Sequence, residues 1–306
     1  MFTAFSKYFL VLSSSLLLNT MAYSLLVTED SPDESSRKSH CARTNSRNEG
    51  SHDCNCVSTD SRNGNRLYFG GFGGGIYSDD SKMSQMGTAL FSEVTDGGPL
   101  AVEARGHAKK NGTGFGGVQL GYEWSKCVDQ CSSWTIAPGA EIEAYWLSRH
   151  IKGLLVNSTD TDRLPEHDFL DTFHMNEGVY LANFLLSLNN TWRLSPYVGA
   201  GIGATRISLH DADSKQIAPL EAGINHFNSR THDSSWAFAA QVKAGLRFNI
   251  CKYHFFGEYR YLFVDTSNYI FGSTVYPTHA HTTPWNVQIE DMQYSAFVFG
   301  VQFDLY

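Results

Sequence analysis

From residue 65 onward, apolar and polar positions alternate along much of the chain. In the last segment, "SAFVFGVQFDLY", the odd-numbered positions from Phe297 to Leu305 are all large and apolar. A period of two residues is typical of a strand with two unlike faces. The same reading predicts eight strands. They span residues 65–77, 114–125, 133–148, 176–192, 196–209, 235–250, 252–265 and 290–306.

The connections between these segments alternate between short and long. The short ones are 126–132, 193–195 and 251, and the long, polar ones are 78–113, 149–175, 210–234 and 266–289. Outer-membrane β-barrels have tight periplasmic turns and long external loops. The pattern therefore predicts an all-β fold, an eight-stranded antiparallel transmembrane barrel with both termini in the periplasm and the four long connections as extracellular loops.

The two faces of the predicted strands differ in charge. The apolar faces of six strands carry no charged residue, whereas the opposite faces carry Glu123, Glu141, Glu143, Lys243, Arg247, Glu258 and Arg260. The glycine-rich segments 65–77 and 196–209 are less decisive. Apolar faces that pointed inward would make a soluble ligand-binding barrel, and apolar faces that pointed outward would contact lipid. Tryptophan near the strand ends favours lipid, because aromatic girdles lie at membrane interfaces. These residues are Trp124, Trp134, Trp146, Trp192 and Trp236.

The first 64 residues have a different texture. Residues 1–24 place Lys7 before a short apolar run and end in small residues, which is typical of a signal peptide for export. A buried N-terminal helix is the alternative. Residues 25–63 are polar and show no periodicity, so we expect a disordered periplasmic extension. The barrel domain is expected to cover 64–306.

Composition narrows the function. The net charge of -8 and the pI of about 5.8 give no basic footprint, so no nucleic-acid partner is expected. The glycine-rich stretch at 70–75 lies in a predicted strand with no following helix, which argues against a phosphate-binding loop. No Ser–His–Asp set can be nominated, so the sequence predicts no catalytic residue, no cofactor and no enzyme.

A metal site is also not predicted. His279 and His281 lie two apart in "THAHTTP", a spacing that could ligate a metal on an extended segment. No cysteine or carboxylate lies within the same few residues, which favours an ordinary solvated loop.

The predicted inward charges leave two interpretations open. They form a paired network that fills the barrel, or they line a narrow ion path. A barrel of eight strands is just wide enough for side chains to fill it, which favours the first. The matching functions are a structural and surface-interaction protein of adhesin-like character, or a small-solute or ion channel. A third hypothesis is an enzyme that modifies outer-leaflet lipid.

Six cysteines fall on the side that the topology assigns to the periplasm. They are Cys41, Cys54, Cys56, Cys127, Cys131 and Cys251. The periplasm is oxidising, so thiols there tend to form disulfides. One interpretation is local pairing, such as Cys127 with Cys131. The other is that the extension is linked by disulfides to the base of the barrel or to neighbouring envelope proteins.

Four segments resemble the opacity-type and OmpA/OmpX-type small outer-membrane barrels of Gram-negative bacteria. They read "SPYVGAGIGATRISL", "AFAAQVKAGLRFNI", "FFGEYRYLF" and "FVFGVQFDLY". The last is similar to the C-terminal assembly signal of such barrels at Gly300, Phe303 and Leu305, although Tyr306 follows as an extra residue. The resemblance implies location in the cell outer membrane. It also implies contact with outer-membrane lipid and the barrel-assembly machinery, and an unknown extracellular ligand for the loops.

Overall fold

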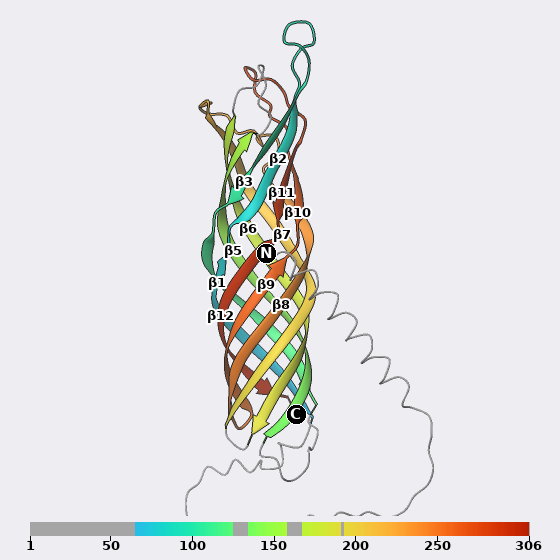
Figure 1. The fold of residues 1–306 in the computed structure, drawn as a ribbon, viewed down its shortest axis with the longest axis vertical. Helices are drawn as coiled ribbons and strands as arrows, with labels where there is room; N and C mark the ends of the chain where they lie inside the picture. Colours follow the sequence, from blue (N-terminus) through green and yellow to red (C-terminus); the bar gives the residue numbers. More distant parts are fainter. Residues whose placement is uncertain (1–64, 125–133, 158–166, 191–192, 306) are drawn as a thin grey trace, which may run out of the picture. The chain divides into compact units, whose positions relative to one another are not determined.

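A computed structural model describes residues 65–124, 134–157, 167–190 and 193–305 (Figure 1). These residues form twelve strands and contain no helix long and apolar enough to cross a membrane. The strands are β1 (Arg66–Ser78), β2 (Ser81–Ala89), β3 (Leu100–Ala108), β4 (Asn111–Glu123), β5 (Trp134–Asn157), β6 (Asp168–Asn190), β7 (Leu194–Ala218), β8 (Asp233–Ile250), β9 (Tyr253–Val264), β10 (Ser267–Phe271), β11 (Trp285–Glu290) and β12 (Met292–Asp304).

Eight of the strands close into a hydrogen-bonded ring. Its order is β1-β4-β5-β6-β7-β8-β9-β12, and every neighbouring pair is antiparallel. The ring closes where β12 pairs with β1, from Tyr68 opposite Asp304 to Ser78 opposite Tyr294. The predicted eight-stranded antiparallel barrel is therefore confirmed.

The remaining strands extend the wall beyond this ring. β10 pairs with β11, β11 with β2, β2 with β3, and β3 with the last residues of β5, from Gly153 to Asn157. They continue the ring strands after interruptions at 79–80, 109–110, 265–266 and 291. We call the ring up to these interruptions the membrane section, and the part beyond them, with the loops it carries, the outer section.

The four predicted loops are therefore shorter than expected, because strands occupy part of each of them. Segment 78–113 contains β2 and β3, and segment 266–289 contains β10 and β11. Segments 149–175 and 210–234 are partly occupied by the ends of β5, β6, β7 and β8. The long connections that remain among the described residues are 90–99, 219–232 and 272–284.

The interruptions shift the phase of the alternation by one residue. β1 buries even-numbered positions such as Phe72 and Ile76, whereas β2 buries odd-numbered ones such as Met83. β12 and β11 differ in the same way across Asp291, whose φ is 47°. A shift of one residue moves every following side chain to the other face. The two halves of such a strand therefore do not share one period in the sequence.

The outer face of the membrane section is apolar, as predicted. Ile202 is 63% exposed and Phe299 is 71% exposed, although both are large hydrophobic residues. The same face carries Val118, Leu120, Ile142, Phe184, Val198, Val242, Leu246, Phe255 and Phe297. Trp124 lies at the end with the short turns, and Trp146 and Trp236 lie toward the outer section. These positions match the two aromatic girdles expected at the membrane interfaces. The side chains of Trp134 and Trp192 lie outside the described residues.

The outer section has the opposite polarity. Its interior is aromatic: the Phe227 and Phe271 rings stack at 4.7 Å, and Phe173 stacks on Phe271 at 5.4 Å. Its outward face carries charged and polar residues, among them Lys82, Arg105, His107, Lys152 and Lys215. The same face also exposes the hydrophobic residues Leu154, Val156, Ile217 and Ile270. A mainly polar exterior around an apolar interior suits a protein wall in water.

Several predictions lie outside the described residues. These are the signal peptide at 1–24, the extension at 25–63, Tyr306, and the cysteines other than Cys251. Cys251 lies in the turn between β8 and β9 and has a φ of 54°.

Candidate functional site

The centre of the membrane section contains a buried layer of charge. The Lys243 ammonium forms ion pairs with Glu141 and with Glu143, the latter at 3.2 Å between Nζ and Oε2. The Arg260 guanidinium forms ion pairs with Glu143 at 3.2 Å and with Glu258. These side chains are almost completely buried, so each charge depends on its partners for the hydration it has lost.

A second ion-pair group lies nearer the short turns. The Arg247 guanidinium is 2.9 Å from Glu123, which also pairs with Arg66 at 3.3 Å. Arg66 reaches Asp304 at 3.5 Å and so joins β1 to β12. The structure thus brings all seven sequence-nominated charges into the lumen. Sequence reasoning missed Arg66, because the glycine-rich β1 gave no clear polar face. It separated the two faces of β12 but did not nominate Asp304, which lies on the face opposite the apolar one.

Neutral polar groups complete these networks. The Tyr68 hydroxyl donates to Glu141 at 2.8 Å, and the Tyr197 hydroxyl donates to Glu258 at 2.6 Å. The Gln241 amide donates to Asn183 at 2.8 Å and also to Glu143. These polar side chains meet in the lumen because residues two apart on a strand share a face, and because neighbouring strands lie in register.

Aromatic rings close the lumen beyond the charged layer. Phe72, Phe115 and Tyr145 pack edge-on or tilted with centroids 5.4–6.2 Å apart. The Arg260 guanidinium lies 4.2 Å from the centroid of the Phe72 ring, within the range of a cation–π interaction. This contact joins the charged layer to the aromatic layer. The lumen is therefore filled at this level, as expected for a small barrel.

A third polar group follows toward the outer section. The Arg149 guanidinium donates to the Tyr294 hydroxyl at 2.8 Å, and this hydroxyl donates to Glu177 at 2.8 Å. Thr205 donates to the other oxygen of Glu177 at 3.3 Å. The sequence predicts a loop at 149–175, whereas Arg149 lies on β5 and His174 lies on β6.

Asp171 is a buried carboxyl in the outer section. With the Gln85 amide turned so that its nitrogen faces the carboxyl, the two oxygens lie 2.9 and 3.2 Å from this nitrogen. Ser214 provides a further hydrogen bond. Burial raises the pKa of Asp171 to about 8, because a charged carboxylate there would lose its hydration.

The outer wall is hollowed just below the outer section. A groove of about 950 Å³ lies over β4, β5, β6 and β7, with Trp146, Tyr180 and Arg206 among its lining residues. Next to it, His150 lies opposite His174, and His174 lies opposite His210. The His150 and His174 rings are 3.7 Å apart. These histidines face outward at the boundary between the two sections.

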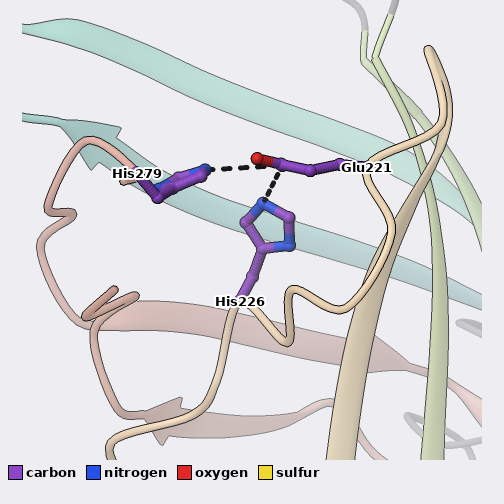
Figure 2. A group of neighbouring side chains, drawn as sticks. All are labelled: Glu221, His226 and His279. Carbon is purple, nitrogen blue, oxygen red and sulfur yellow. Dashed lines mark ion pairs between the residues drawn. The ribbon is translucent and has the colours of Figure 1, made fainter. Parts of the chain in front are cut away.

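A group of metal-ligand type caps the outer section. Glu221 and His226, in the β7–β8 loop, meet His279 from the β10–β11 loop (Figure 2). His279 therefore faces Glu221 and His226, which lie more than 50 positions earlier in the sequence. Its neighbour in the sequence, His281, is not a member of this group. Sequence spacing had no signal for this group, because its members come from different loops.

No protein-family description matches this sequence, and no curated protein matches it. The structure has weak similarity to solved structures. The outer membrane protein OprG from Pseudomonas aeruginosa is 15% identical with a TM-score of 0.40, and the match covers 79% of this chain and 98% of that one. The outer membrane protease OmpT from Escherichia coli is 7% identical with a TM-score of 0.36, covering 77% and 97%. Neisserial surface protein A is 12% identical with a TM-score of 0.31, covering 75% and 97%.

The fold assignment rests on the strand pairing and the two surfaces. A closed antiparallel ring with an apolar outer belt, aromatic residues at both ends of the belt and a polar lumen has the design of an outer-membrane β-barrel. Only lipid can cover such a belt favourably, so the chain is built to reside in an outer membrane.

Proposed function

We propose that this protein is a surface-interaction barrel, in which a filled membrane section anchors a solid outer section that displays recognition loops. The observation that supports the proposal is the change in wall polarity between the membrane section and the outer section. Below the boundary, the wall is apolar outside and charged inside. Above it, the wall is mostly polar outside, with Leu154, Val156, Ile217 and Ile270 as exposed exceptions, and its interior is rich in aromatic rings. A wall with the second arrangement is stable in water and holds the loops beyond the lipid.

The loops expose apolar side chains to the outside. Val94 is 94% exposed and Leu220 is 77% exposed, and Leu90 and Val275 are also exposed. Isolated exposed hydrophobic residues are common on proteins, but several of them on neighbouring loops are suited to contact with a macromolecular partner. This supports an adhesin-like role in preference to transport.

The proposal is tested by expressing the barrel on a Gram-negative host that adheres poorly. Adherence to immobilised matrix proteins and cell monolayers would be measured for the wild type and for a variant with Leu90, Val94, Leu220 and Val275 all changed to Ser. A control variant would change Lys82, Glu103, Lys152 and Lys215 to Ser on the outer wall. We expect the loop variant to lose adherence and the control to keep it. Equal adherence of the wild type and an empty-vector strain would contradict the proposal.

The channel hypothesis has a separate readout. A charged lumen is suited to ions, but the packed rings of Phe72, Phe115 and Tyr145 lie beyond the charged layer. We therefore expect purified barrel in planar lipid bilayers to show no stable open state. A steady porin-like conductance from the wild-type protein would favour the channel.

A further inference from the structure

The cap of the outer section holds two imidazoles and a carboxylate that point at one position. The Glu221 Oε2 atom is 3.7 Å from His226 Nε2 and 3.5 Å from His279 Nε2 (Figure 2). The ligand atoms of all three residues lie within 4.8 Å of one another. These separations are too long for hydrogen bonds. Ligands of a tetrahedral ion with bonds of about 2.0–2.1 Å lie roughly 3.3–3.4 Å apart, close to the separations from Glu221.

Both imidazoles are oriented by the backbone. His226 Nδ1 lies 3.0 Å from the Ser214 carbonyl oxygen, and His279 Nδ1 lies 2.6 Å from the Ala280 carbonyl oxygen. A carbonyl only accepts, so in each neutral ring Nδ1 carries the proton and Nε2 presents a lone pair. Metal-binding histidines typically have this arrangement, in which the second nitrogen donates to a backbone carbonyl.

The surroundings of His226 keep its ring in place. The ring packs edge-on against Phe169 at 5.2 Å and Trp285 at 5.9 Å. Glu221 and His279 are more exposed, which leaves one side of the group open to solvent.

The two loops that carry these residues are already joined. The Asn228 side chain donates to the Val275 carbonyl at 2.8 Å and accepts from the Val275 amide at 2.9 Å. Thr274 donates to the His226 carbonyl at 2.9 Å. The ligands are therefore held near their positions before any ion binds, which lowers the ordering cost of binding.

We propose that Glu221, His226 and His279 form a binding site for a divalent transition-metal ion of the zinc type, with a fourth position open to water or an external ligand. Two imidazoles and one carboxylate suit Zn²⁺, which keeps an open position in sites with three protein ligands. The site goes beyond the surface-interaction role and does not depend on it. Bound metal would tie the β7–β8 loop to the β10–β11 loop.

The test uses the full barrel in detergent micelles, treated with chelator and dialysed. Zn²⁺ is added and binding is measured by titration calorimetry and by metal analysis after equilibrium dialysis. We expect one strong site in the wild type. Glu221→Gln and His279→Ala should each weaken it at least about 10-fold, since even loss of an outer-shell partner of a metal site costs about 10–100-fold in affinity.

The matched controls are His150→Ala and His174→Ala, which alter the exposed histidine row on the outer wall. They should leave the strong site unchanged. Folding of every variant is checked by its heat-dependent mobility on electrophoresis, and the two most exposed ligands are varied so that folding is preserved. Absence of a strong site in the wild type would overturn the proposal. So would equal Zn²⁺ affinity in the wild type and both ligand variants, or loss of the site in the histidine-row controls alone.

Discussion

Lys243 neutralises two buried carboxylates at once, Glu141 and Glu143. We expect Lys243→Met to lower the free energy of unfolding by about 3–5 kcal/mol, because it leaves buried negative charge without its partner. The exposed pair of Lys215 and Asp213 provides the control. Lys215→Met should change stability by only about 0–1 kcal/mol. Urea unfolding in lipid vesicles, followed by tryptophan fluorescence, measures both, and equal midpoints would contradict the assigned network.

Asp171 gives a prediction for pH. Its folded pKa of about 8 lies above the ordinary value of 3.8, so the folded protein retains a proton that the unfolded chain has lost between these values. Its contribution to stability is therefore fully present below about pH 3.8 and is lost as the pH rises toward 8. One such proton gives a slope of about 1.4 kcal/mol per pH unit.

Asp171→Asn removes this group and keeps its shape. We expect the variant to unfold at higher urea concentration than the wild type at pH 7, with the difference shrinking at pH 5. Unfolding curves collected from pH 5 to pH 8 measure this difference. A difference that did not change with pH would mean that Asp171 is ionised in the folded barrel.

At the scale of the strand, the seam between β1 and β12 depends on glycine. A Cβ atom at Gly74 would lie 2.0 Å from the Phe297 carbonyl oxygen, whereas a Cβ at Gly75 would meet no atom within 4 Å. Gly74→Val should therefore reduce the yield of folded barrel, and Gly75→Val should fold normally. The yields are read from the fraction with heat-dependent mobility. Similar yields for the two variants would place the close approach elsewhere.

The sequence predicts the strands of the membrane section well, because a period of two runs along most of them, the glycine-rich strands being less decisive. The terminal strand and the strand 235–250 are examples, and their apolar faces lie outward as expected. It does not predict β2, β3, β10 and β11. The buried side of β2 holds Ser81, Ser84 and Gln85, so this strand has no apolar face to detect. The phase of the alternation also changes where a ring strand meets an outer strand, as at Asp291, which has a φ of 47°. The polar residues on the outward face of these strands therefore give a sequence pattern that resembles a loop.

The same limit applies to the candidate sites. The charges on alternating strands could be assigned to the lumen, because a strand's two faces are separable in the sequence. The meeting of Glu221 with His226 and His279 depends on how two loops fold over the end of the barrel. No local spacing encodes that contact.

For the whole molecule, we expect proteases to distinguish loops from the outer section. On intact cells, cleavage should occur near Val94 and Leu220, which are highly exposed, and not within β3 or the last residues of β5, which are paired in the sheet. Mass spectrometry of released fragments locates the cuts. Cleavage throughout 100–108 or 149–157 would show that these segments behave as loops.

The length of β5 determines which molecules can meet the cap. β5 continues from the boundary at Arg149 to Asn157, and a tilted strand of that length rises on the order of 20 Å. The headgroup layer on one side of a bilayer is only roughly 5–8 Å thick. A large protein such as an antibody or a phage tail fibre can therefore contact the cap without entering the headgroup layer. Changes in lipid composition do not alter the surface that it binds.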